Sequence, residues 1–351
     1  MTMPTIKKKV RVMVVDDSAV ARNILISGLS SRPDLEVVGY AVNAADALKK
    51  VGELRPDVMT LDVEMPGMNG IELLRRLLPA YPLPVILVSS LNLQVFEALA
   101  AGAVDFVRKP DGTRSLQEFS AALARKIVIA SYARVLKTAP VQKVPVQVEA
   151  APPPLGVGGG LDQVMIGLGA STGGTEATLE VLKRLPADIP GMIVVQHMPP
   201  GFTKMYAERL DRLCAMEVRE ASDGDEVRRG LVLVAPADLQ ARVIRNGPRY
   251  YLSCKPGEKV SGHRPSVDAL FFSMAEIVRH KMVGIIMTGM GRDGARGLLN
   301  MRKAGAYTIG QDRESSVVYG MPMVAKEIGA VEVQAPCDAI AGVLLRRLKE
   351  V

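Results

Sequence analysis

Residues 166–175, with the sequence IGLGASTGGT, could serve two kinds of chemistry. The glycines Gly167, Gly169 and Gly173 resemble a loose dinucleotide-binding turn, which places a pyrophosphate at the N-terminus of a helix. The letters from Gly169 to Gly173 also spell G-x-S-x-G, the turn that exposes a nucleophilic serine between a strand and a helix. The first interpretation predicts an oxidoreductase, and the second predicts a hydrolase.

The next residues along the chain favour the hydrolase. A dinucleotide site needs an acidic ribose partner, or an arginine, near the end of the next strand. The next apolar run, residues 192–195, leads instead to Gln-His, with His197. The pair Tyr251 and Lys255 has a reductase-like spacing, but Pro256 comes directly after it and excludes the helix that such a pair needs.

A nucleophilic serine needs a base, nearly always histidine, that is oriented by a carboxylate. His197 follows the strand after that of Ser171, so both side chains are expected at the same edge of a parallel sheet. Asp293 follows the strongly apolar run 283–287 in a glycine-rich loop and is the predicted carboxylate, with Asp312 as its rival. The order Ser, His, Asp differs from that of the α/β-hydrolases, but a triad is defined by geometry.

The chain contains three histidines. His280 ends the stretch FFSMAEIVRH and is predicted to lie on the surface or at a helix end. His263 directly precedes a predicted helix. It is left open whether His263 lines the pocket, and it is not expected to act as the base.

The first part of the chain alternates short apolar runs with amphipathic stretches, which predicts five βα units around a parallel sheet. Polar residues follow the ends of four of these strands. Because the carboxyl ends of parallel strands meet at one edge of an open sheet, these residues are expected to share a crevice. The predicted strands are 10–15, 36–41, 58–61, 85–88 and 104–107, and the polar residues are Asp16, Asp17, Asp62, Ser89 and Lys109.

Three converging carboxylates repel one another unless a hard cation lies among them, and oxygen ligands suit Mg²⁺. An aspartate beside such a metal can accept a phosphoryl group, whose oxygens Ser89 and Lys109 would contact. The alternative is that Asp16 and Asp17 cap a helix and Asp62 lies in a turn. Five polar groups in register at four strand ends favour the phosphoryl site.

The length of 351 residues and the hydrophobic content of 48% predict two domains, each with its own core. Residues 137–160 carry five prolines and end in glycines, which predicts a semi-extended linker. The second part repeats the α/β pattern, with predicted strands 164–168, 192–195, 283–287 and 306–310 and a helix at 175–185. The predicted fold class is α/β, with a five-stranded doubly wound parallel sheet followed by a larger parallel-sheet hydrolase domain.

Charge and composition limit the kinds of partner and the cellular location that we expect for this chain. Residues 1–136 contain 17 Lys/Arg and 14 Asp/Glu, and residues 161–351 contain 25 and 22, so each part carries only +3. This distribution argues against a nucleic-acid partner. No apolar run of about 18 residues and no signal-type N-terminus appear, so we expect a cytoplasmic protein without direct membrane insertion. Cys214, Cys254 and Cys337 are widely spaced, which predicts buried, inert thiols rather than disulfides or zinc.

The segments VVDDS, LDVEMPGMNG and VRKP resemble the receiver domain of bacterial response regulators, over about residues 8–130. The resemblance implies that Asp62 is the phospho-acceptor and that Mg²⁺ is the cofactor of this domain. The implied metal site consists of Asp16, Asp17, Asp62 and the backbone of Glu64. The residues implied to sense phosphorylation are Ser89, Lys109 and Phe106.

The segments GASTGG, QHMPPGFT, GHRPSVD and TGMGRDG resemble the catalytic domain of the chemotaxis protein-glutamate methylesterases, the CheB family. The resemblance runs over about residues 162–348, within a predicted catalytic domain of residues 161–351. The resemblance implies hydrolysis of γ-glutamyl methyl esters on chemoreceptors, with release of methanol, and deamidation of glutamines as a second activity. Ser171 would attack the ester, His197 would transfer the proton and Asp293 would orient the imidazole. Thr172 would lie beside the site, and the backbone N–H of Met290 would help to bind the oxyanion.

The same resemblance implies the partners. Methylated cytoplasmic helices of chemoreceptors would be the substrate, and a chemotaxis histidine kinase would be the phosphodonor, with no cofactor in the esterase domain. The alternative is a response regulator whose output domain is non-catalytic or binds DNA. The low charge and the absence of a basic recognition helix argue against DNA binding, and all three triad residue types argue against a non-catalytic domain.

Overall fold

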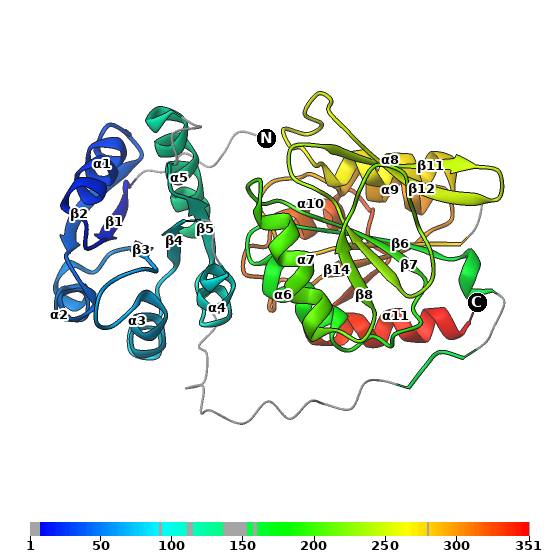
Figure 1. Ribbon diagram of the computed structural model, residues 1–351, viewed down its shortest axis with the longest axis horizontal. Coiled ribbons are helices and arrows are strands. Elements are labelled where there is room, and N and C mark those ends of the chain that lie inside the picture. The colour runs from blue at the N-terminus through cyan, green and yellow to red at the C-terminus, as the bar shows by residue number, and fades with distance from the viewer. Residues whose placement is uncertain are drawn as a thin grey trace. The chain divides into compact units, whose positions relative to one another are not determined.

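The computed structural model describes residues 8–90, 93–110, 115–135, 153–156, 160–278 and 281–350. The chain forms two compact units, Met1–Pro145 and Val146–Val351, which run from blue to teal and from green to red in Figure 1. Most of the predicted linker 137–160 lies outside the described residues, as does His280. The domain limits 8–130, 137–160 and 161–351 stay predictions.

The first unit is built on the predicted five-stranded parallel sheet, in the order β2-β1-β3-β4-β5. Helices α1 and α5 pack together on one face, and α2, α3 and α4 form a row on the other (Figure 1). The strands are β1 Val10–Val15, β2 Leu35–Ala41, β3 Val58–Asp62, β4 Val85–Ser89 and β5 Asp105–Arg108. The helices are α1 Ala19–Ser30, α2 Ala44–Leu54, α3 Gly70–Leu77, α4 Gln94–Ala100 and α5 Leu116–Ala130.

Burial and capping explain this arrangement. Every residue of β3 and β4 is buried, as expected for central parallel strands that helices cover on both faces. Polar caps begin the helices: Ser18 starts α1, and Ser115 forms a reciprocal capping box with Glu118 at the start of α5. The predicted βα alternation is therefore confirmed.

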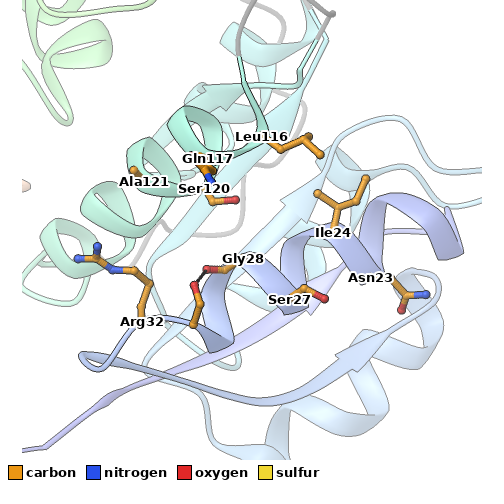
Figure 2. Close-up of a pocket in the computed structure, with 10 residues that line it drawn as sticks. Asn23, Ile24, Ser27, Gly28, Arg32, Leu116, Gln117, Ser120 and Ala121 are labelled. Atoms are coloured by element: carbon orange, nitrogen blue, oxygen red, sulfur yellow. Dashed lines mark hydrogen bonds between the residues drawn. The ribbon is translucent and has the colours of Figure 1, made fainter.

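A surface hollow of about 630 Å³ lies between α1 and α5 (Figure 2). The two helices approach closely at Gly28, where an added Cβ would lie 2.3 Å from Oγ of Ser120. A larger residue at this position would require Ser120 to move. None of the predicted phosphorylation residues lines the hollow, whose walls are Asn23, Ile24, Ser27, Gly28, Ser31, Arg32, Leu116, Gln117, Ser120 and Ala121.

The second unit contains a seven-stranded, fully parallel sheet in the order β15-β14-β13-β6-β7-β10-β8. Helices α6, α7 and α11 cover one face, and α8, α9 and α10 cover the other (Figure 1). The strands are β6 Met165–Ala170, β7 Gly191–Gln196, β8 Glu217–Glu220, β10 Leu231–Val234, β13 Met282–Ile286, β14 Tyr307–Gln311 and β15 Val333–Ala335. The helices are α6 Gly174–Leu182, α7 Phe202–Leu213, α8 Val267–Ile277, α9 Ala295–Lys303, α10 Met321–Glu327 and α11 Ile340–Lys349, with short 3-10 turns at Leu161–Gln163 and Cys337–Ala339.

Several elements of the second unit differ from the sequence prediction, which did not include strands β8, β10 and β15. Helix α6 ends at Leu182, not at Leu185, because Pro186 disfavours helical backbone at the residue before it. A small antiparallel sheet, β11 (Gln240–Asn246), β12 (Arg249–Lys255) and β9 (Asp225–Glu226), was not predicted. Tyr251 and Lys255 lie in β12, so the reductase-type helix is excluded, as the sequence indicated.

Two further properties of the described residues bear on the sequence predictions. None of their helices is both long enough and apolar enough to cross a membrane. Cys214, Cys254 and Cys337 are free thiols, and burial raises the pKa of each to about 12. Cys254 alone among them is fully buried, but all three remain protonated near neutral pH, which agrees with the prediction of inert thiols.

Strands β6, β7 and β13 are neighbours at the centre of the seven-stranded sheet. Ala170 pairs with Gln196, and Gly169 pairs with Ile286. Helix α8 lies directly against β6. The two elements are so close that a Cβ on Gly169 would lie 2.2 Å from the side chain of Val267. The residues that come after these strands therefore meet at one edge of the sheet, beside the N-terminus of α8.

Candidate active site

Ser171 occupies the first position after β6, in the predicted strand-turn-helix geometry. Its N–H donates to the carbonyl oxygen of Thr288 at 3.0 Å. Its carbonyl oxygen accepts from Nε2 of Gln196 at 2.8 Å and from the N–H of Gly174 at 2.7 Å. Gly173 has φ +78°, a conformation that suits glycine, and it lets the chain turn at once into α6. The half-buried serine side chain is thereby held at the sheet edge.

His197 occupies the equivalent position after β7. Its N–H donates to the carbonyl oxygen of Ala170 at 3.1 Å, which fixes it beside Ser171 along the sheet edge. Its ring Nε2 lies 2.9 Å from Oδ2 of Asp293. Its Nδ1 is buried and has no hydrogen-bond partner among the described residues. Nδ1 is therefore the nitrogen that remains for a proton transfer.

Asp293 is fully buried, and the N-terminus of α8 surrounds its carboxylate. Oδ1 accepts from Oγ of Ser266 at 2.7 Å and from the N–H of Asp268 at 2.9 Å. Oδ2 accepts from the N–H of Val267 at 2.8 Å in addition to the imidazole of His197. Burial by itself raises the pKa of Asp293. The hydrogen bond from His197, the charge of His197 and the hydrogen bonds from the start of α8 together lower it by more, so the pKa lies below its ordinary value. The carboxylate is thus ionised when it faces the imidazole.

The rival carboxylate, Asp312, has a different role. Its Oδ1 accepts from both the N–H and the hydroxyl of Ser315, at 2.9 and 2.6 Å. These bonds close a turn after β14. Asp293, the predicted carboxylate, is therefore the aspartate that the structure places against His197.

The loop after β13 passes close to Ser171. A Cβ on Gly289 would lie 2.7 Å from Cβ of Ser171, and Met290 is the next residue along this loop. The buried hydroxyl of Thr288 donates to the carbonyl oxygen of Thr172 at 2.9 Å. The predicted near-site residues Thr172 and Met290 therefore lie on the two segments that flank the serine.

Three residues that support the site were not predicted. Gln196 and Thr288 hold the backbone at Ser171, and no sequence signal besides their places at the ends of β7 and β13 could have indicated them. His263 stacks on His197, with ring centroids 3.9 Å apart and an interplanar angle of 3°. The sequence left the place of His263 open, although its motif GHRPSVD runs into α8, whose N-terminus binds Asp293.

The first unit brings its predicted residues together as well. Nζ of Lys109 lies 2.5 Å from Oδ2 of Asp62 and 3.9 Å from Oδ2 of Asp16. The N–H of Glu64 donates to Oδ1 of Asp62 at 3.1 Å. Asp16, Asp17 and Asp62 each have a carboxylate oxygen within 4.8 Å of the others. Asp16 and Asp62 are buried and Asp17 is exposed, so the crevice opens to solvent on one side.

The electrostatics of this crevice favour a cation. Burial and the charge of Asp62 raise the pKa of Asp16, and Lys109 lowers it only in part, so the pKa lies above its ordinary value. Oδ2 of Asp16 and the hydroxyl of Ser89 are buried, and neither has a hydrogen-bond partner among the described residues. Phe106 is buried in β5. An acidic oxygen without a donor fits a hard metal ion, and an unpartnered hydroxyl fits an incoming phosphoryl oxygen.

The two sites define a class of protein, a receiver-type phosphorylation unit joined to an α/β serine hydrolase, and comparisons with known proteins agree. The family description "CheB methylesterase" matches residues 166–344, and "Response regulator receiver domain" matches residues 12–120. A protein-glutamate methylesterase/protein-glutamine glutaminase 2 of Syntrophomonas wolfei is 50% identical over 345 residues, 98% of this chain and 99% of the relative. A protein-glutamate methylesterase/protein-glutamine glutaminase of Syntrophotalea carbinolica is 45% identical over 350 residues, 98% of this chain and 99% of the relative.

A solved structure extends the agreement to the fold. The catalytic domain of Thermotoga maritima CheB methylesterase is 36% identical and superposes with a TM-score of 0.51, covering 52% of this chain and 97% of that domain. The chain belongs to the CheB methylesterase family. The family resemblance stated from the motifs is confirmed. A DNA-binding or non-catalytic output domain is not favoured, because the second unit matches the methylesterase family.

Proposed function

We propose that this chain is a phosphorylation-regulated esterase that hydrolyses γ-glutamyl methyl esters on the cytoplasmic helices of chemoreceptors and releases methanol. The observation that carries the proposal is the geometry of His197. Its Nε2 is hydrogen-bonded to the ionised Asp293. Its Nδ1 has no hydrogen-bond partner among the described residues, at the sheet edge that bears Ser171. A serine, a base and an orienting carboxylate in this order are the parts of a nucleophilic triad.

The first half of the reaction forms an acyl-enzyme. Oγ of Ser171 attacks the γ-carbonyl carbon while its proton passes to Nδ1 of His197. Asp293 stabilises the imidazolium through Nε2. The tetrahedral intermediate then expels the methoxy group, which takes the proton from Nδ1 and leaves as methanol.

The second half restores the enzyme. Nδ1 of His197 takes a proton from water as the water oxygen attacks the acyl carbon, and Oγ of Ser171 leaves with that proton. The product is a free glutamate side chain. If the substrate is glutamine, the same steps release ammonia, which supports glutaminase as a second activity of this site.

The charge that develops on the carbonyl oxygen needs donors. We assign this role to the backbone N–H of Met290, with Thr172 beside it, because the loop after β13 runs past Ser171. A single such donor contributes roughly 3 kcal/mol to transition-state stabilisation in other hydrolases.

The first unit supplies regulation. Asp62 is the proposed phospho-acceptor, and a histidine kinase of the chemotaxis system is the proposed phosphodonor. Asp16, Asp17, Asp62 and the carbonyl oxygen of Glu64 would hold Mg²⁺, which supplies charge neutralisation for transfer to a carboxylate. Lys109 and Ser89 would bind the phosphoryl oxygens, and Phe106 would repack in response. Because the substrate helices and the kinase are cytoplasmic, we place the enzyme in the cytoplasm.

The test measures methanol released from membranes that contain methylated chemoreceptors. Ser171→Ala and His197→Ala should each lower turnover by several orders of magnitude, because the members of a triad act as a unit. Ser222→Ala, which changes an exposed serine of the same unit, should retain normal turnover. A variant of Ser171 or His197 that keeps a tenth of the activity would contradict the assignment.

A further inference from the structure

The imidazole of His197 is held by a single side-chain hydrogen bond among the described residues, the one from Nε2 to Asp293. The torsion that orients a histidine ring is broad and roughly two-fold, so one bond leaves the ring free to tilt. A tilt would move Nδ1 away from the position in which we propose that it takes the proton of Ser171. A contact with the face of the ring would oppose such a tilt.

His263 provides that contact. Its ring lies parallel to that of His197, at a centroid distance of 3.9 Å. The side chain of His197 is 11% exposed and that of His263 is 41% exposed. His263 therefore lies between one face of the base and the solvent.

The backbone around His263 is rigidly built. His263 and Val260 exchange two backbone hydrogen bonds, at 2.9 and 3.1 Å. Nε2 of the buried Gln240 donates to the carbonyl oxygen of His263 at 3.0 Å, and Oε1 of Gln240 accepts from the N–H of Ser266 at 3.1 Å. The same loop is thus tied to the start of α8, where Asp293 is bound.

The ring of His263 is also fixed. Its Nδ1–H donates to the carbonyl oxygen of Ser261 at 3.0 Å. The hydroxyl of Ser261 in turn donates to Oδ2 of the buried Asp268 at 2.7 Å. This chain of contacts restrains the plane of His263, against which the ring of His197 stacks.

His263 remains uncharged during the reaction. Burial and the neighbouring His197 lower its pKa to about 4, although the charge of Asp293 and the carbonyl oxygen of Ser261 oppose this shift. Lys259 lowers the pKa further. A neutral aromatic face attracts a cation, so it stabilises the imidazolium of His197, whereas a protonated ring would repel it.

The cluster of His197, His263 and Asp293 also has the residue types of a metal site, and its ligand atoms lie within 4.8 Å of one another. Metal ligation requires the nitrogen lone pairs to converge on one point. The lone pairs of two parallel stacked rings run side by side instead. The cluster is therefore arranged for stacking.

We propose that His263 is a positioning residue for the esterase reaction. Its neutral ring holds the plane of His197, so that Nε2 stays on Asp293 while Nδ1 faces Ser171, and its face stabilises the imidazolium that forms. This inference rests on the proposed function, because it assumes that Ser171 and His197 carry out the chemistry.

The test uses the full chain and three substitutions that separate the ring from its hydrogen bond. His263→Phe keeps an aromatic face and loses the donor to Ser261, His263→Asn keeps a donor and loses the face, and His263→Ala loses both. We expect kcat for methanol release from methylated receptor membranes to fall roughly 10- to 100-fold in the Asn and Ala variants, as misplacement of a reacting group does. The Phe variant should stay within about five-fold of wild type, and KM should be unchanged in all three.

A second readout is the rate at which a small fluorophosphonate labels the serine, which does not depend on receptor binding. It should fall in parallel with kcat. Thermal melting would reveal whether His263→Ala unfolds. If it does, the comparison of kcat between His263→Phe and His263→Asn decides whether His263 positions His197. The inference is overturned if all three variants keep wild-type kcat, if Phe is as slow as Asn, or if KM rises while kcat is unchanged. Labelling that persists in Ser171→Ala would instead overturn the proposed function itself.

Discussion

Asp293→Asn is the substitution whose consequences the structure determines most sharply. The carboxylate accepts four hydrogen bonds, two at each oxygen, from His197, Ser266, Val267 and Asp268. An asparagine of the same size has one acceptor oxygen. Its NH₂ group would therefore face two donors at the other position, whichever way the amide is turned.

Two effects result from this mismatch. If the NH₂ group faces Nε2 of His197, it requires that nitrogen to accept, so the proton moves to Nδ1 and the base can no longer take the proton of Ser171. Loss of the correct tautomer lowers kcat by on the order of 10⁴-fold in serine hydrolases, less than loss of the serine. In this orientation the buried N–H of Val267 loses its acceptor, which should also lower the free energy of unfolding by about 1 to 3 kcal/mol.

The assay combines methanol release with urea unfolding of the same preparation. Asp312→Asn is the matched control, since it makes the same change at the rival carboxylate and should leave kcat within about three-fold of wild type. The reasoning fails if Asp293→Asn keeps more than a hundredth of wild-type kcat, or if Asp312→Asn is the more damaging of the two.

Three further expectations concern regulation and pH. With Mg²⁺ and a small acyl phosphate, wild-type protein should be labelled at Asp62, and label on Asp62→Asn would refute the receiver site. A fragment of residues 161–351 should demethylate receptors faster than the unphosphorylated full chain, and phosphorylation should raise the rate of the full chain toward or beyond that of the fragment. If the fragment is no faster than the unphosphorylated full chain, inhibition by the receiver is excluded. The pKa of His263 is lowered to about 4 in the folded protein, from about 6.5 in the unfolded chain. Between these two pH values the unfolded state binds more protons than the folded state. The wild type should therefore lose stability as the pH falls from about 6.5 to about 4. His263→Phe should lack this component in urea titrations at pH 7 and pH 5, and an equal pH dependence in both proteins would contradict it.

The sequence alone was enough to predict the fold class, and it named the candidate site residues. Buried parallel strands are near-continuous apolar runs, and the polar residue that ends each run marks the sheet edge where ligands bind. This rule led directly to Asp16, Asp62, Ser171 and His197. The antiparallel strands β11 and β12 escaped prediction because their exposed faces carry mixed polar residues, which leave no comparable apolar run.

Only the tertiary structure decided how these residues act on one another. Whether Asp293 or Asp312 contacts the N-terminus of α8 and the imidazole of His197 depends on how these elements pack. The spacing of residues along the chain does not specify that packing. The stacking of His263 on His197 depends likewise on a loop held by the distant Gln240. Local sequence specifies where a strand ends and which residue comes next, whereas the direction of a buried carboxylate or ring is set by donors and surfaces from elements far away in the chain.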